Sequence, residues 1–131
     1  KSVSFRSDVF RFANIMNLLI HYEMGEKLSI EYFFIATKRF ITKQNNIYAF
    51  ESWFLKFFKQ LMKLEKNNFT SFFKEKELEL LDIFKDKKER KAIEMFNILA
   101  WVRIKHENLS FEDVVKEYAK QPYENYLKSR L

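Results

Sequence analysis

The chain has 131 residues, including one glycine, one proline and no cysteine, and its formal net charge is +6. Phosphate-binding loops and nucleophile elbows depend on glycine, so this composition argues against both kinds of site. The absence of cysteine excludes disulfides, thiolate metal sites and cysteine nucleophiles. With 47% hydrophobic and 18% aromatic residues, the chain is instead predicted to form one all-α domain over residues 1–131.

Apolar residues at three- and four-residue spacing predict three helices in the first half of the chain. The first has Ser7 or Asp8 as its N-cap and ends where Gly25 can adopt the left-handed cap conformation. Its predicted core-facing stripe consists of Val9, Phe12, Ala13, Met16, Leu19 and Ile20. The second helix spans about 29–43, and the third, strongly hydrophobic one about 47–66.

The second half is predicted to contain three more helices. The fourth begins at Asn68 or Thr70 and runs to about 85, and the fifth spans about 87–106. Ser110 and Asp113 have the spacing of a capping box, which opens a short sixth helix. Pro122 ends that helix and precedes a last turn over 123–131.

The predicted helices recur with a regular period, because the first, third and fifth start near residues 8, 47 and 87. A period of about forty residues is typical of paired helices in α-solenoids. We therefore expect about six helices in antiparallel pairs. The pattern leaves two arrangements open, a tetratricopeptide-like superhelix and a compact helical bundle.

Three segments carry a resemblance to a known group of proteins: residues 18–25 (LLIHYEMG), 37–40 (TKRF) and 48–58 (YAFESWFLKFF). They resemble the C-terminal helical segment of large bacterial proteins whose upstream parts are tetratricopeptide-like arrays. The resemblance covers the first half of the chain and implies a helical-repeat fold in the bacterial cytoplasm. Because the sequence opens at Lys1 rather than at a methionine, we expect it to be the C-terminal fragment of a longer repeat protein.

One carboxylate interrupts the apolar strip of the third predicted helix, where Glu51 shares a face with Phe54 and Phe58. A buried charge needs a partner, because leaving it unpaired costs several kcal/mol. Arg39 lies one turn after apolar residues of the preceding helix, so we predict a structural ion pair between Arg39 and Glu51, with His21 attached. A catalytic role for Glu51 is the alternative, but it lacks a second acid, base or metal.

The two histidines do not fit a metal site. Neither His21 nor His106 has a glutamate three residues before it, as the di-iron bundle motif requires, and the His-Glu-x-x-His zinc motif is absent. We therefore predict no metal, no cofactor and no catalytic residue, and expect the chain not to be an enzyme.

The basic excess lies in the first half of the chain, where a positive stripe follows one face of the third helix. Its members are Lys56, Lys59, Lys63 and Lys66, and Lys38, Arg39 and Lys43 lie near the end of the second helix. Arrayed cations could contact the phosphates of a nucleic acid. The alternative is a solvated face with no binding role, because the one water-facing side of so hydrophobic a helix must be polar.

The function predicted from these features is a non-catalytic scaffold for protein–protein interaction, or the C-terminal cap of a repeat array. The expected partner is another protein or the missing N-terminal part of the same chain, with a homodimer as a further option. The second candidate is a basic module that binds nucleic acid through the lysines named above. No apolar stretch approaches the ~20 residues of a membrane span, so no membrane partner is expected.

Overall fold

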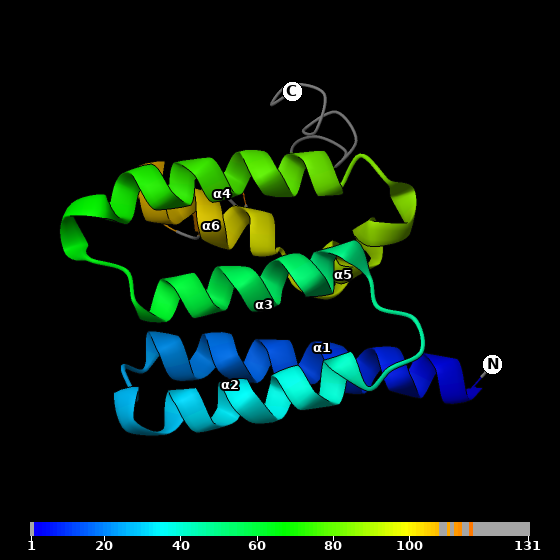
Figure 1. Ribbon diagram of the computed structural model, residues 1–131. Helices are drawn as coiled ribbons and strands as arrows, with labels where there is room; N and C mark the ends of the chain where they lie inside the picture. The colour runs from blue at the N-terminus through cyan, green and yellow to red at the C-terminus, as the bar shows by residue number, and fades with distance from the viewer. Residues whose placement is uncertain (1, 108–109, 111, 114–115, 117–131) are drawn as a thin grey trace. The chain divides into compact units, whose positions relative to one another are not determined.

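A computed structural model describes residues 2–107, 110, 112–113 and 116 of the chain (Figure 1). All of its regular structure is helical, and the described residues contain no strand, as the sequence predicted. The elements are α1 (Ser2–Glu23), α2 (Lys27–Thr42), α3 (Ala49–Met62), η1 (Lys66–Asn68), α4 (Phe69–Ile83), η2 (Lys87–Arg90), α5 (Lys91–Met95) and α6 (Ile98–Glu107), where η marks a 3₁₀-helix. No helix among these residues is both long and apolar enough to cross a bilayer.

Contacts within the chain define two compact units, residues 1–51 and 52–131. The first contains α1, α2 and the opening turn of α3, and the second contains the rest of α3 and all later elements. Each unit is described by itself below. The organisation as a single domain stays a prediction.

In the first unit, α1 and α2 lie side by side and antiparallel (Figure 1). Gly25 makes the reversal between them, with φ +72°. The amide of Gly25 bonds to the carbonyl of Tyr22 at 3.1 Å, and the amide of Glu26 bonds to the carbonyl of His21 at 3.2 Å. These two bonds form a Schellman motif, which closes the last turn of α1 and confirms the predicted role of Gly25.

The buried stripe of α1 differs from the predicted one. It consists of Arg11, Ile15, Leu18 and Leu19. Val9, Ala13 and Ile20, which the sequence assigned to the core, are exposed. The prediction was right for Leu19, and Phe12 and Met16 are half-buried. It was wrong for Val9, Ala13 and Ile20, because α1 carries apolar residues on two opposite faces and periodicity alone does not say which face turns inward.

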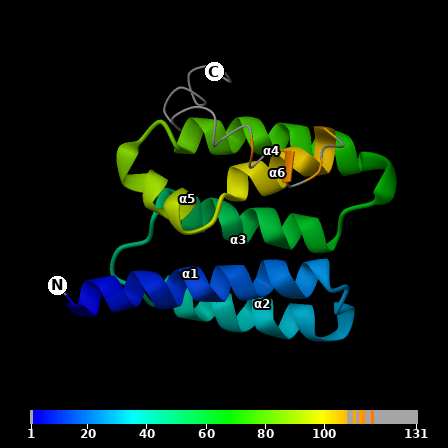
Figure 2. The same ribbon diagram turned by 180° about the vertical axis from the view of Figure 1, so that it is seen from behind.

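In the second unit, α4 packs antiparallel to α6 (Figure 2). An aromatic cluster joins α3, α4 and α6 around Phe57. The ring centroid of Phe57 lies 5.8 Å from that of Phe72, 6.1 Å from that of Phe73 and 6.3 Å from that of Trp101. Phe73 and Trp101 also meet edge to face at 5.8 Å. Such aromatic pairs add stability beyond the area they bury, which explains how three short helices form a packed core.

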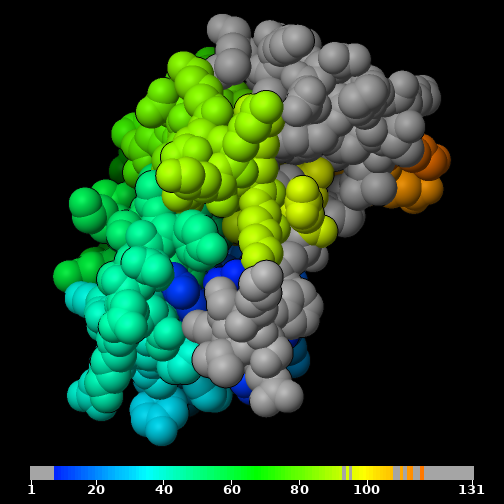
Figure 3. Space-filling model, turned by 90° about the vertical axis from the view of Figure 1, so that its right-hand side faces the viewer, coloured from blue at the N-terminus to red at the C-terminus, as the bar shows by residue number. Residues whose placement is uncertain are grey.

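The predicted fifth helix is not continuous. Its span divides into η2, α5 and α6. The break between α5 and α6 falls at Phe96, which adopts an extended conformation with φ −152° and ψ 133°. Asn97 then caps α6, since its side-chain oxygen accepts a hydrogen bond from the amide of Ala100 at 3.0 Å. Asparagine is among the best N-cap residues, so the break has a local cause. The segment before η2, including Lys85 and Asp86, is exposed on the surface (Figure 3).

The third helix is shorter than predicted, because α3 ends at Met62 and is followed by turns. The sixth predicted helix and the last predicted turn lie almost entirely outside the described residues. At its start, the amide of Asp113 donates to the hydroxyl oxygen of Ser110 at 3.1 Å. This bond is the forward half of the predicted capping box.

Candidate functional site

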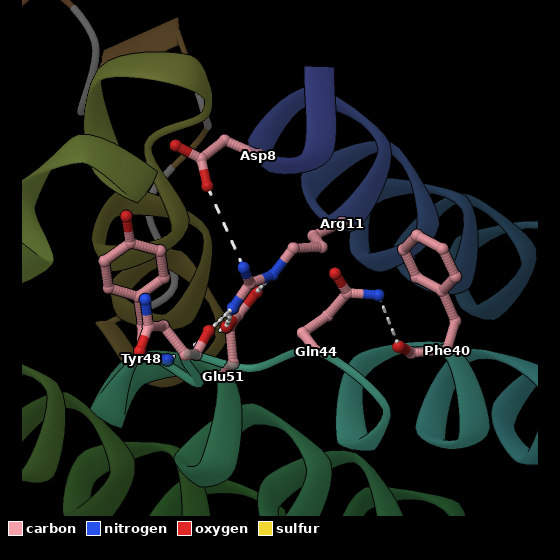
Figure 4. Close-up of polar contacts among 7 residues, drawn as sticks. Asp8, Arg11, Phe40, Gln44, Tyr48 and Glu51 are labelled. Carbon is pink, nitrogen blue, oxygen red and sulfur yellow. Dashed lines mark hydrogen bonds and ion pairs between the residues drawn. The ribbon is translucent and has the colours of Figure 1, made fainter. Parts of the chain in front are cut away.

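Glu51 is buried, as predicted, and its partner is Arg11. The two residues are 4% and 5% exposed, and the guanidinium binds the carboxylate through two nitrogens, with Nε 2.8 Å from Oε2 and Nη2 bonded to Oε1. Nη2 also donates to the main-chain carbonyl of Asn46. Figure 4 shows the guanidinium held between Glu51 and Asp8, whose Oδ1 lies 4.0 Å from Nη1.

The same carboxylate caps the helix on which it lies. Glu51 is the third residue of α3, and its Oε1 accepts a hydrogen bond from the amide of Tyr48 at 2.9 Å. This contact is the backward half of a capping box, and a carboxylate in the first turn is favoured by the helix dipole. The Arg11 guanidinium carbon lies 5.2 Å from the centre of the Tyr48 ring, within the range of a cation–π contact. The pair therefore fixes the start of α3 against α1.

Two opposing effects act on the pKa of Arg11. Burial by itself lowers the pKa of the guanidinium, whereas the hydrogen bond and the charge of Glu51, helped by Asp8 and Tyr48, raise it. The net result is a pKa above the ordinary value, so the guanidinium of Arg11 stays charged. The hydrogen bonds of this guanidinium to Glu51 hold α1 against the first turn of α3.

The prediction that Arg39 pairs with Glu51 is therefore wrong, because the cation bound to Glu51 is Arg11. Arg39 is exposed on α2, and none of the carboxylates among the described residues pairs with it. Nor does His21 join Glu51, because its Nδ1 contacts the carboxylate of Glu26. Its ring also stacks on Phe33, with centroids 4.4 Å apart and planes at 18°. His21 thus ties the end of α1 to the start of α2.

The other histidine joins two helices of the second unit. His106 Nε2 on α6 lies 3.0 Å from Oε1 of Glu77 on α4, and the two side chains are 8% and 5% exposed. Trp53 on α3 donates its indole N–H to Glu79 Oε1 at 2.8 Å, and the ammonium of Lys76 lies 3.1 Å from the same oxygen. The His106–Glu77 and Trp53–Glu79 contacts join different helices, whereas Lys76 and Glu79 pair within α4.

The buried ionisable groups named above contact each other. Across the residues that the structure describes, no group of three or more histidine, aspartate and glutamate side chains is arranged to hold a metal ion.

The predicted basic residues are all exposed. Lys56 and Lys59 lie on α3, Lys63 follows it and Lys66 begins η1. None of the four is paired with a carboxylate of the described part of the chain. Lys38 and Lys43, in the first unit, are exposed as well.

Several large apolar side chains of α1 and α2 are exposed. We call six of them the α1·α2 outer face: Phe10, Ile20, Met24, Leu28, Tyr32 and Ile35, which are 60%, 49%, 65%, 101%, 71% and 50% exposed. Helical spacing places the first three on one side of α1 and the last three on one side of α2. On each helix this side is opposite the buried stripe, so both sets turn away from the core.

Sequence reasoning missed Arg11 and the α1·α2 outer face for the same reason. The heptad-like run of Arg11, Ile15, Leu18 and Tyr22 marks the inward side of α1, but Val9, Ala13 and Ile20 mark its other side equally well. A cation within an apolar run was the available signal for Arg11, because such a residue needs a buried anion.

Comparisons of the chain with protein-family models, with curated proteins and with solved structures found no match. The resemblance to the C-terminal segment of tetratricopeptide-like bacterial proteins therefore stays a prediction.

Proposed function

We propose that this chain is a non-catalytic helical interaction module, and that it binds another protein through the α1·α2 outer face. The observation that carries the proposal is the exposure of six large apolar side chains on one helix pair. Scattered apolar residues on a surface are ordinary, whereas a contiguous patch marks a surface for binding. Leu28 is 101% exposed, so its side chain buries no surface against the rest of the chain.

The finer proposal is that the module is built like a unit of an α-solenoid and closes a repeat array. The antiparallel pair of α1 and α2, followed by α3 and α4 at a spacing of about forty residues, supports this reading. In a solenoid each helix pair buries one face against the next pair, so a pair with an apolar outer face has room for a further neighbour. A partner could accordingly be another protein or a preceding part of a longer chain.

Site-specific photo-crosslinking tests the proposal. A benzophenone amino acid replaces Tyr32 on the α1·α2 outer face, and the control carries it at Lys74, which is exposed on α4. After irradiation in cells that naturally produce the protein, we expect covalent products from position 32 and none from position 74, with each product identified by mass spectrometry. A further variant carries the benzophenone at Phe10, and if neither this variant nor the one at position 32 gives a product, the proposal fails.

The second candidate function is nucleic-acid binding by the lysine stripe. Lys56, Lys59, Lys63 and Lys66 are exposed and unpaired among the described residues, which leaves their ammonium groups free for phosphates. Four contacts with a single strand would give a slope of log K against log salt of about −3.

Fluorescence anisotropy with a labelled single-stranded oligonucleotide tests this candidate. Lys56, Lys59 and Lys63 are replaced by glutamate, and the control places the same charge change at Lys74, Lys87 and Lys88, which are also exposed. Loss of binding in the first triple variant alone supports the candidate. Equal losses of binding in the two triple variants would show that the oligonucleotide is attracted by net charge alone. Absence of binding by the wild type at low salt would exclude this candidate function.

A further inference from the structure

Met24 belongs to the α1·α2 outer face and lies where the chain passes from one helix to the next. Its amide donates to the carbonyl of Ile20 at 3.0 Å, so it continues the last turn of α1 just before Gly25. Ile20 precedes it by four residues and Leu28 follows it by four, and all three side chains are exposed. A chemical change at the thioether of Met24 therefore alters the apolar surface at the α1–α2 reversal.

Exposure distinguishes Met24 from the other methionines whose side chains the structure describes. Met24 is 65% exposed, whereas Met16 on α1 and Met62 at the end of α3 are half-buried. The chain has no cysteine, so its four methionines are the sulfur groups that an oxidant can attack. Because a dissolved oxidant must reach the sulfur, we expect Met24 to react before Met16 and Met62.

The reaction with hydrogen peroxide is a two-electron oxidation of the sulfur. A sulfur lone pair attacks one peroxide oxygen, and the S–O bond forms as the O–O bond breaks. The proton of the transferred oxygen passes to the departing hydroxide, which leaves as water. The product is methionine sulfoxide, and reductases specific for each of its two epimers return it to the thioether. The modification is therefore reversible.

A sulfoxide at position 24 would oppose binding at the α1·α2 outer face. Apolar area removed from water drives the association of proteins, whereas a polar oxygen buried without a hydrogen-bond donor costs free energy. We expect the fold itself to persist, because most of the Met24 side chain is in contact with solvent rather than with the core. Oxidation would thus change the surface and leave the helices that carry it intact.

We infer that Met24 is a site of reversible oxidation by peroxide, and that its sulfoxide releases the protein bound at the α1·α2 outer face. The release rests on the proposed function, since it assigns a means of regulation to the same surface. The preferential oxidation rests on exposure alone, so it is tested without a partner.

Oxidation of the whole chain by dilute hydrogen peroxide, followed by peptide mass spectrometry, tests the site. In the folded protein, sulfoxide should form at Met24 about fivefold faster than at Met16 and Met62. The matched control is the same reaction in concentrated urea, where the three rates should become equal because unfolding exposes every sulfur. Equal rates in the folded protein would overturn the inference.

Photo-crosslinking from position 32 tests the release. The purified chain is oxidised, the peroxide is destroyed with catalase, and the chain is added to an extract of cells that naturally produce it. The yield of covalent product should fall about tenfold, and treatment with methionine sulfoxide reductases should restore it. Met24→Leu keeps an apolar side chain that peroxide does not oxidise, so its yield should be the same before and after oxidation.

The outcomes separate the two proposals. If the unoxidised chain crosslinks to a protein and full oxidation of Met24 leaves the yield unchanged, the interaction function stands and the release is overturned. A loss of yield that Met24→Leu shows as well would also overturn the release, because other residues would then be responsible. If neither position 10 nor position 32 crosslinks in the unoxidised chain, the interaction function fails and the release fails with it.

Discussion

Arg11 and Glu51 lie forty positions apart in the chain and form a buried, two-pronged ion pair between α1 and the first turn of α3. The pair also forms hydrogen bonds with the carbonyl of Asn46 and the amide of Tyr48, so it holds the last residues of the segment before α3. Desolvating two charges is costly, and these additional hydrogen bonds are what offset the cost.

Removing one member of this pair should be strongly destabilising. Glu51→Met leaves the Arg11 guanidinium buried without its anion, and we expect the free energy of unfolding to fall by about 3–5 kcal/mol. The double variant Arg11→Met with Glu51→Met removes both charges and should recover most of that loss. Urea denaturation followed by circular dichroism measures the three values.

The matched control is Arg39→Met, since Arg39 is exposed and was the cation predicted from the sequence. Its stability should stay within about 0.5 kcal/mol of the wild type. If Arg39→Met lost as much free energy of unfolding as Glu51→Met, the result would support the predicted Arg39–Glu51 pair and contradict the observed Arg11–Glu51 pair.

Gly25 should be the most sensitive position in the α1–α2 reversal. An added Cβ would meet no atom within 4 Å, so the only cost of Gly25→Ala is the left-handed backbone at φ +72°. That cost is about 1–2 kcal/mol. Asparagine tolerates this conformation better, and Gly25→Asn should lose less. Thermal unfolding of both variants gives the comparison, and an alanine variant as stable as the wild type would refute the Schellman motif.

The break before α6 can be tested at its cap. Asn97→Ala removes the side-chain oxygen that accepts from the amide of Ala100, and we expect a loss of about 1 kcal/mol. Asn97→Asp keeps the acceptor and should be close to neutral. If alanine were stabilising instead, residues 91–107 would favour the continuous helix that the sequence predicted.

Tyr22 should make stability depend on alkaline pH. Burial, and secondarily the charge of Glu23, raise the pKa of its phenol above the ordinary value of about 10. The folded state then holds its proton more tightly than the unfolded state. The associated stability is fully present below pH ~10 and is lost as the pH rises through the folded-state pKa.

Urea midpoints measured from neutral pH to beyond pH ~10 should therefore fall more steeply in the wild type than in Tyr22→Phe. Tyr32→Phe, which alters an exposed ring, is the matched control and should follow the wild type. Parallel curves for all three proteins would contradict the assignment to Tyr22.

Several features were decided by the sequence because they depend on neighbouring residues alone. Gly25 can adopt the left-handed conformation without a Cβ penalty, so it ends α1 wherever that helix packs. The helical class follows from apolar spacing and from the near-absence of glycine and proline. Glu51 was recognisable as a buried charge because it interrupts the apolar strip of α3.

Tertiary structure alone decided which residue neutralises Glu51 and which face of α1 is outside. Both answers depend on contacts between distant segments, and α1 offers apolar residues on two sides that local spacing cannot rank. Once Arg11 binds Glu51, the side of α1 that carries Ile15 and Leu18 turns inward. Phe10, Ile20 and Met24 are then left exposed on the opposite side, because a helix cannot bury both faces against one neighbour.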